Sequence, residues 1–441
     1  MRMKFNKPSQ LILVSAFSLL AAGLMTACGT LTTDYVYVAS SQAAGPNSYG
    51  EIDVFEINAV SGFMRHIPTS PFPSGGRNPV AEAVSGDFAN LYVVNQDDNT
   101  IVQFKIGSDG KLYPLNTVNT PGVFPLAVAV NGSNLFVLDT YQPLPTCSNA
   151  EPCSGSIAVF SLLTKDQATK ANLFPWDDTL GPTVANPANA ANYWPLTLKS
   201  FVSFGGTSTP IGVSNAGVGG GSCSTTSSSD VILPTGITVL ASGADVFVSA
   251  YDVTANTGYV FGFAVGSSGV LTPLNCGVPF VAGVHPSAIA SDSSSTYVYV
   301  TDSTNGNVLG YSVASGLLTK LSGSPFPTGN KPSAIVVDSN SSYPYAYVAN
   351  SLDGSVSAYS IGSGGALTRI GTYAAGLQPA AIGIDPSTNH FVFTANFLGS
   401  NVSNIEISTA TGTLIDTQHS PFTSSALPTA VAAVPHQTSL R

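Results

Sequence analysis

Residues 332–338 read Pro332-Ser333-Ala334-Ile335-Val336-Val337-Asp338, and the chain soon continues with Ala346-Tyr347-Val348-Ala349-Asn350. The first stretch is an apolar segment opened by a proline, and the second alternates aromatic residues with valine. Both are typical of short β-strands. Similar pairs of strands along the rest of the chain decide the predicted fold.

Three sequence markers recur seven times in the same order. The proline that opens the apolar strand stands at Pro79, Pro125, Pro234, Pro286, Pro332, Pro379 and Pro428. The aromatic residue of the next strand stands at Tyr37, Tyr92, Phe136, Phe247, Tyr299, Tyr347 and Phe393. A further strand ends in a large residue at Phe55, Phe104, Phe160, Phe263, Tyr311, Tyr359 and Ile405. Gly-x-Leu starts of a fourth strand follow in most repeats, so each repeat holds about four strands.

Four short antiparallel strands in roughly 45 to 50 residues make a propeller blade. We therefore predict an all-β fold, a seven-bladed β-propeller of four-stranded antiparallel blades over residues 34–435, followed by a tail at 436–441. The spacing of 111 residues between Phe136 and Phe247 contains one set of markers. We interpret it as one blade with insertions at about 164–196 and 205–231.

The two ends of the chain predict how the ring closes. The sequence starts on an aromatic-valine strand and finishes on an apolar strand opened by Pro428. One blade must then be completed by strands from both termini, which removes exposed sheet edges. An open stack of β-sandwiches would not explain seven markers in unbroken order.

The first 27 residues resemble a bacterial lipoprotein signal peptide. Three basic residues precede an apolar run over residues 11–25, which is short for a membrane span. The run ends at Cys28, where a lipobox cysteine would be lipidated and become the new N-terminus, followed by a short tether at 28–33. The alternative is an ordinary cleaved signal peptide with a chance cysteine. We expect a protein exported to the cell envelope and lipid-anchored, in the periplasm or at the outer membrane.

Charge and composition narrow the classes of partner. The 441 residues are 44% hydrophobic and only 9% charged, as in a globular protein with a large core. Without residues 1–27, 11 basic residues face 24 acidic ones, a net charge of −13. Nucleic acid and anionic lipid headgroups are therefore not expected as partners, and the membrane is reached only through the lipid on Cys28.

Four cysteines remain besides Cys28, and an even number in an exported chain predicts two disulfides. Cys147 and Cys153 bracket a short loop, which favours a local pair and leaves Cys223 with Cys276. A Cys-only zinc site is the alternative, although the spacings differ from the paired CxxC knuckles of structural zinc. The five histidines show no metal-ligand spacing, so neither a metal nor another cofactor is expected.

The repeats quoted above resemble the YVTN-type repeats of the lactonase family of seven-bladed propellers, which includes the propeller 6-phosphogluconolactonases. The resemblance covers nearly all of residues 34–435. It implies a lactone hydrolase with charged residues in the central channel and a Gly-Pro-Arg-His stretch entering an inner strand. This chain departs from that pattern, since its only Arg-His pair, Arg65-His66, lies on a different strand.

The family resemblance implies that the residues just before each repeated proline lead into the strand nearest the propeller axis. They include His285, Lys331 and Gln378, with Arg77 adjacent to this set. Because propeller rims are generally polar, these side chains are either solvated loop residues or part of a ligand site at the channel mouth.

Glu82 stands three residues after Pro79, where the other six repeats have valine or isoleucine. A buried carboxylate needs a cationic or hydrogen-bonding partner or a raised pKa. A one-residue bulge would instead turn Glu82 to solvent. The two interpretations remain open at this point.

A second polar ring follows the aromatic-valine strands, at Ser40, Asn95, Asp139, Ala250, Asp302, Asn350 and Asn396. Asn and Asp commonly cap turns through their side chains, and we expect that role here. A cation or sugar site is the alternative.

These observations favour a noncatalytic envelope propeller that binds a small-molecule or protein ligand through one face. The alternative is a lactonase, a carboxylic ester hydrolase, that would use Arg77, Glu82, His285 and Lys331.

Overall fold

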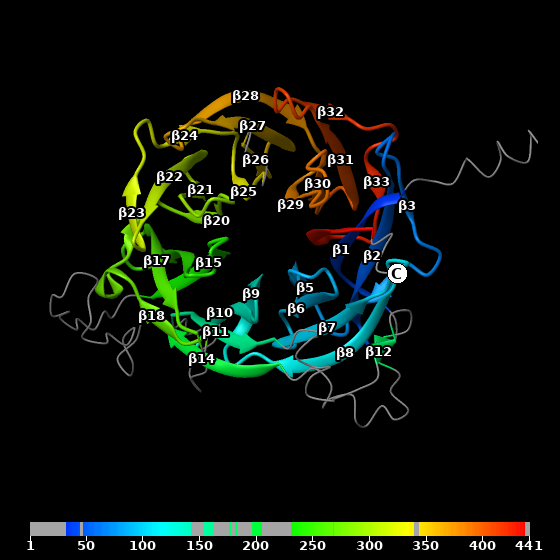
Figure 1. The fold of residues 1–441 in the computed structure, drawn as a ribbon, viewed down its shortest axis with the longest axis horizontal. Coiled ribbons are helices and arrows are strands. Elements are labelled where there is room, and N and C mark those ends of the chain that lie inside the picture. Colours follow the sequence, from blue (N-terminus) through cyan, green and yellow to red (C-terminus); the bar gives the residue numbers. More distant parts are fainter. Residues whose placement is uncertain are drawn as a thin grey trace, which may run out of the picture.

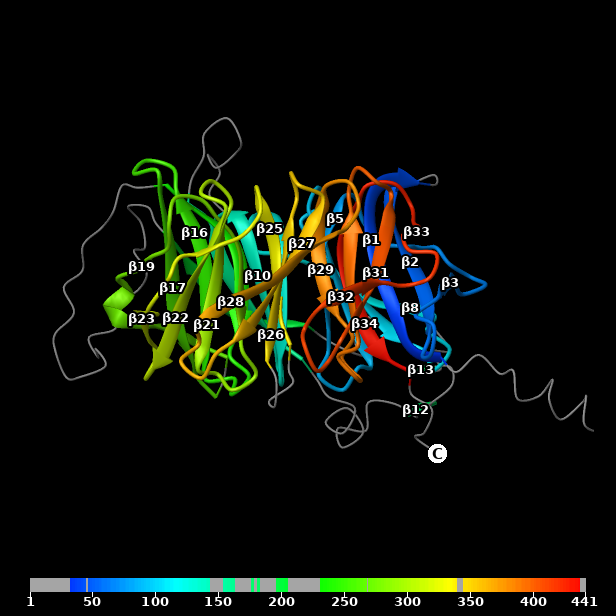
Figure 2. The same cartoon turned by 90° about the horizontal axis from the view of Figure 1, so that it is seen from above.

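The computed structural model of the chain describes residues 32–44, 47–142, 154–162, 176–177, 181–182, 196–204, 231–267, 269–338 and 344–436. Seven antiparallel sheets stand around one central axis, and the chain travels from blade to blade around the ring (Figure 1). Figure 2 shows the ring from its edge, with strands that run from one face to the other. The predicted seven-bladed all-β propeller is confirmed.

Each blade begins with an inner strand at the axis and continues outward. The inner strands are β5 (Pro79–Val84), β9 (Val123–Asn131), β15 (Ile232–Val239), β20 (Pro286–Ser291), β25 (Pro332–Val337), β29 (Pro379–Ile384) and β34 (Pro428–Pro435). The second strands are β1 (Thr32–Ala44), β6 (Asn90–Asn95), β10 (Asn134–Tyr141), β16 (Asp245–Asp252), β21 (Tyr297–Asp302), β26 (Tyr345–Asn350) and β30 (Phe391–Asn396). Every inner strand contacts the inner strands of both neighbouring blades, so the ring is continuous.

Two further layers complete the blades. The third strands are β2 (Tyr49–Asn58), β7 (Thr100–Ile106), β11 (Ser156–Ser161), β17 (Thr257–Val265), β22 (Asn307–Ala314), β27 (Ser355–Ile361) and β31 (Asn401–Ile407). The outer strands are β3 (Met64–His66), β8 (Leu112–Asn119), β14 (Thr197–Ser203), β18 (Leu271–Pro273), β23 (Leu317–Lys320), β28 (Leu367–Ala374) and β32 (Leu414–Asp416). Short strands β4 (Phe72–Pro73), β19 (Phe280–Val281), β24 (Phe326–Pro327) and β33 (Phe422–Thr423) pair with third strands. A 3₁₀ turn, η2, covers Asn275–Gly277.

The blade that contains both termini closes the ring as the sequence predicts. In this sheet β34, the last strand of the chain, pairs with β1, the first, and β2 and β3 follow outward. The pairing joins Tyr37 to Ala432 and Val38 to Val431. Because β34 completes this sheet on its inner side, β1 pairs on both sides and presents no free edge.

The aromatic residues that mark the second strands are all nearly completely buried. Among them, Tyr37 and Tyr299 reach the next blade: their hydroxyls donate to the carbonyls of Gly110 and Gly365, at 3.0 and 2.8 Å. Both glycines have positive φ and open the Gly-x-Leu turn. The aromatic and glycine markers therefore recur together because one blade's tyrosine satisfies the backbone of the next blade's turn.

The predicted insertions fall on either side of β14, the outer strand of the β9 blade. The first separates β11 from β14, and the second separates β14 from the next inner strand, β15. Within the first, β12 (Trp176–Asp177) pairs with β13 (Gly181–Pro182). Most of both insertions, together with residues 1–31, Cys147, Cys153 and Cys223, lies outside the described residues, so the lipidation and the disulfide pairing of Cys276 stay predictions.

Candidate functional site

The axis of the propeller holds a cavity of about 280 Å³ walled by the inner strands. Its lining comes mainly from the first three positions after the repeated prolines, and most of these residues are Ala, Val or Ile. In most of the inner strands a register shift follows the proline, as between Pro79 and Ala81. Such a bulge re-aims the side chains that follow it. Small residues two positions after the proline thus leave the channel open.

Hydroxyl side chains on this wall tie neighbouring inner strands together. Ser287 donates to the carbonyl of Pro332 at 2.6 Å, and Ser333 donates to the carbonyl of Pro379 at 2.7 Å. Thr429 of the closing blade donates in the same way to the carbonyl of Pro79 in the β5 blade, at 2.7 Å. We call these three bonds the hydroxyl clasps. Their sequence signal is a Ser or Thr directly after the repeated proline.

Glu82 lies on β5 and lines the axial cavity. The bulge at the start of β5 does not turn its carboxylate to solvent: Glu82 pairs with Val93 of β6, and both carboxylate oxygens are shielded from water. Neither oxygen has a hydrogen-bond partner within normal geometry among the described residues. Glu82 therefore places in the wall of the cavity a carboxyl group that has no hydrogen bond of normal geometry among the described residues.

The surroundings of Glu82 explain how this carboxyl group is tolerated. Burial raises its pKa well above the usual range, and a weak interaction with the backbone N–H of Ala432 on β34 offsets only part of this effect. The negative charge of Glu82 in turn contributes to the raised pKa of Tyr37, on β1. The carboxyl group thus lies at the seam between the β5 blade and the closing blade, where burial favours its neutral form.

The other predicted site residues lie in the loops before the inner strands. Arg77 is exposed and forms an ion pair with Asp98, whose carboxylate also accepts a bond from the Arg77 backbone N–H at 2.7 Å. Lys331 and Gln378 are also exposed. They belong to the group of residues before prolines that adopt positive φ, namely Asn78, Phe124, Lys331, Gln378 and Leu427.

His285 is half-buried, and its ring lies 4.5 Å from that of Tyr251, centroid to centroid. Its Nδ1 is 3.3 Å from the hydroxyl of Ser303. Among the described residues, no ion pair or hydrogen bond joins Glu82 to Arg77, His285 or Lys331. The structure therefore brings Glu82 into the channel but gives it none of the three cations as a direct partner.

The polar ring after the second strands is buried and supports the loops before the prolines. Backbone N–H groups of Gly122, Gly329 and Gly376 donate to Asp139, Asn350 and Asn396 at 3.1, 3.0 and 3.2 Å. A Cβ at any of these glycines would collide with the side chain it bonds. These side chains cap turns, as expected. The bonds named here hold the turn that leads into the inner strand.

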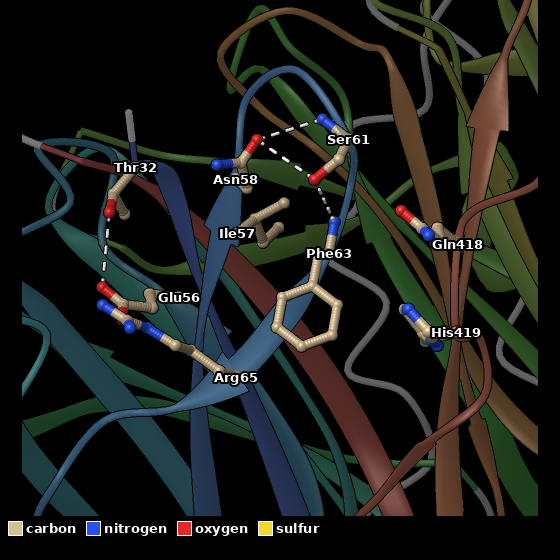
Figure 3. A pocket seen from close by; sticks show the side chains of 9 residues that line it. All are labelled: Thr32, Glu56, Ile57, Asn58, Ser61, Phe63, Arg65, Gln418 and His419. Atoms are coloured by element: carbon tan, nitrogen blue, oxygen red, sulfur yellow. Dashed lines mark hydrogen bonds and ion pairs between the residues drawn. The ribbon is translucent and has the colours of Figure 1, made fainter. Parts of the chain in front are cut away.

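A second hollow, of about 300 Å³, lies at the outer side of the closing blade (Figure 3). Arg65 and Glu56 form an ion pair in it, and Thr32 donates to Glu56 at 3.3 Å. The ring of Phe63 meets that of His419 edge-on, with centroids 5.7 Å apart. Because Arg65 and Glu56 are paired with each other, neither side chain is an unpaired charge for a ligand in this hollow.

The described residues hold no group of three or more His, Cys, Asp or Glu side chains placed to bind a metal ion. The part of the chain that the structure describes also contains no helix of the length and apolar character needed to span a bilayer.

Comparison with known proteins agrees with the architecture. A family described as "Lactonase, 7-bladed beta-propeller" matches residues 318–432, which include all of the β25 blade. No curated protein matches the sequence. The family match is thus limited to residues 318–432, and the structures below compare the whole fold.

Three solved structures resemble the chain over nearly its whole length. A Bacteroides uniformis protein provisionally named 6-phosphogluconolactonase has a TM-score of 0.64 at 16% identity, over 91% of this chain and 100% of that one. A Bacteroides fragilis protein with the same provisional name has 0.64 at 17%, over 92% and 99%. The periplasmic gluconolactonase of Pseudomonas aeruginosa has 0.60 at 16%, over 91% and 99%. At these identities the likeness shows the fold alone.

Proposed function

We propose that this protein is a noncatalytic binding propeller of the bacterial cell envelope, anchored through a lipid on Cys28, which takes a small ligand into its axial channel beside Glu82. The lipobox-like sequence before Cys28 supports the anchor. The relationship to lactonase-like propellers supports a ligand site on the axis.

The observation that carries this proposal is the unpaired carboxyl group of Glu82. A buried carboxyl group without a partner destabilises the fold, and the same position is aliphatic in the other six repeats. Such a residue is retained most readily where it serves a ligand, because perturbed ionisable groups cluster at functional sites.

The arrangement of the charged side chains favours binding over hydrolysis. Opening a lactone requires stabilisation of the oxyanion that develops on the carbonyl, usually by a cation or aimed N–H donors. Arg77 is instead held by Asp98, and Lys331 lies exposed in its loop. Glu82 therefore lacks a cationic side chain as a partner in hydrolysis.

A lactone hydrolase is the second candidate. The family match and the gluconolactonase of similar fold favour it. A carboxyl group with a raised pKa can also act as a general base near working pH. In this case Glu82 would activate water toward the lactone carbonyl.

Hydrolysis assays on the purified protein separate the two candidates. Glucono-1,5-lactone, its 6-phosphate and γ-butyrolactone are followed by proton release in a pH-stat, with Glu82→Gln and the exposed-site control Glu406→Gln. We expect hydrolysis at the rate of buffer alone for all three proteins. Turnover that is present in the parent and in Glu406→Gln but absent in Glu82→Gln would establish the lactonase instead.

A further inference from the structure

The lining of the axial cavity contains one ionisable side chain, and that side chain is acidic. The lining includes one carboxyl group, Glu82, and no Lys, Arg or His. The remaining lining residues are Gly, Ala, Val and Ile with three hydroxyl residues, Thr235, Ser287 and Thr429. An anionic ligand such as a phosphate or carboxylate would find no counter-charge among these side chains, and desolvating it there would be unfavourable.

The hydroxyl groups of the wall do not change this balance. Ser287 and Thr429 use their protons in the hydroxyl clasps, and Thr235 pairs with Ser249 at 3.0 Å. Toward a ligand the oxygens of Ser287 and Thr429 can therefore act as acceptors only. Acceptors beside a carboxyl group suit a ligand that donates hydrogen bonds.

The position of the Glu82 side chain bears on ligand binding. In the structure its carboxyl group is tucked into the seam near Ala432, shielded from water, while the residue lines the cavity. No hydrogen bond of normal geometry holds it there, so turning the side chain toward the channel sacrifices little. A cation in the cavity would stabilise the ionised, outward position.

From this arrangement we infer that the axial channel binds a small organic cation, such as a primary alkylammonium, and discriminates against phosphate and carboxylate ligands. The inference rests on the proposed function, since it specifies the ligand class of the same channel. A volume of 280 Å³ equals that of about nine liquid water molecules and is enough for a ligand of a few heavy atoms.

The exchange of charge in this site is balanced. Where the carboxyl group of Glu82 is protonated it releases that proton to solvent, and the ammonium group, which keeps all of its protons, becomes the partner of the carboxylate. On the seam itself, Tyr37 of β1 is the titratable group that senses Glu82, and its hydroxyl donates to Gly110. The facing residue on β34, Ala432, contributes only backbone. Because a cation beside Glu82 favours the ionised carboxylate, affinity should rise with pH.

Calorimetric titration tests the inference with n-butylammonium, n-butanol and butyrate as probes. The protein is titrated at pH 6, 7 and 8 in two buffers of different ionisation enthalpy, which counts the protons released. We expect butylammonium to bind with a net release of protons, and butanol and butyrate to bind at least tenfold more weakly. Glu82→Gln should lose at least tenfold in butylammonium affinity, whereas Glu406→Gln should bind like the parent.

The outcomes separate the two proposals. Binding of butanol or butyrate that equals butylammonium and depends on Glu82 would leave the channel as a binding site and overturn its selectivity for cations. Butylammonium binding that is unchanged in Glu82→Gln would overturn the inference as well. If no probe binds and Glu82-dependent lactone turnover is found, the proposed function fails together with the inference.

Discussion

Asp139 and Asp302 occupy the same position in two blades, at the ends of β10 and β21, and their carboxyl groups respond to burial in opposite ways. Burial raises the pKa of Asp139 to about 7, and the bonds that its side chain accepts from Thr120 and from the Gly122 N–H offset only part of this shift. Its Oδ1 atom is buried without a partner among the described residues.

Asp302 is equally inaccessible to solvent, and burial alone would raise its pKa too. It receives hydrogen bonds from the backbone N–H groups of Val284, His285 and Thr304 and from Asn305, which together lower its pKa. The difference between the two aspartates is therefore a difference in the number of donors that each loop supplies.

Asp139→Asn should stabilise the protein at pH 7. Folding raises the pKa of the Asp139 carboxyl group, so the free energy of unfolding of the parent decreases as the pH rises from the unfolded pKa, about 4, to the folded pKa. Replacing Asp139 by Asn should therefore raise the free energy of unfolding by up to about 4 kcal/mol at pH 7 and leave it unchanged near pH 4. Asn350 and Asn396 show that this position accepts an amide. Urea unfolding at pH 4, 5.5 and 7 measures the effect, and equal gains at all three values would contradict it.

Asp302→Asn should have the opposite sign. The lowered pKa contributes stability above the unfolded value, about 4, which is lost as the pH falls through the folded value. Replacing charge-assisted bonds by weaker ones should cost about 1 to 3 kcal/mol at pH 7. Melting temperatures at pH 7 and pH 3 provide the check, and a loss at pH 3 as large as that at pH 7 would exclude this explanation.

Glu82→Ile should stabilise the protein at neutral pH, since isoleucine occupies the matching position of four other inner strands. The raised pKa of Glu82 means that stability falls as the pH rises above its unfolded value of about 4.3. We expect a clear gain in melting temperature at pH 8 and a smaller one at pH 4.5. Destabilisation at pH 8 would indicate that the carboxyl group has a structural partner.

Ser333→Ala should cost about 1 kcal/mol, because it removes the hydroxyl clasp to Pro379 while keeping the size of the residue nearly unchanged. Ser363→Ala, in an exposed turn, is the matched control. Chemical denaturation compares the two. Equal stabilities would show that the clasp contributes nothing to the ring.

Cys28→Ala should release the protein from membranes or leave an unprocessed precursor, since the predicted lipid attaches at this cysteine. Fractionation of cells and mass analysis of the N-terminus measure both outcomes. Unchanged membrane association and processing in the variant would remove the lipoprotein prediction.

The number of blades, their strand order and the closure by both termini were predictable from the sequence. Each of these depends on a pattern repeated within about 50 residues: a proline before an apolar strand, an aromatic-valine strand and a Gly-x-Leu turn. The aromatic residues at Tyr37 and Tyr299 pack the same way in their blades, so seven weak local signals reinforce one another.

The properties of the site depended on contacts between blades, which no local pattern encodes. Sequence alone singled out Glu82 but could not choose between channel and solvent, because the choice depends on the seam with β34, some 350 residues away. It grouped Arg77, His285 and Lys331 by their position before a proline, whereas the structure holds Arg77 on Asp98 and stacks His285 on Tyr251. Asp139 and Asp302 look equivalent in the sequence, and only the donors that the folded loops supply make them differ.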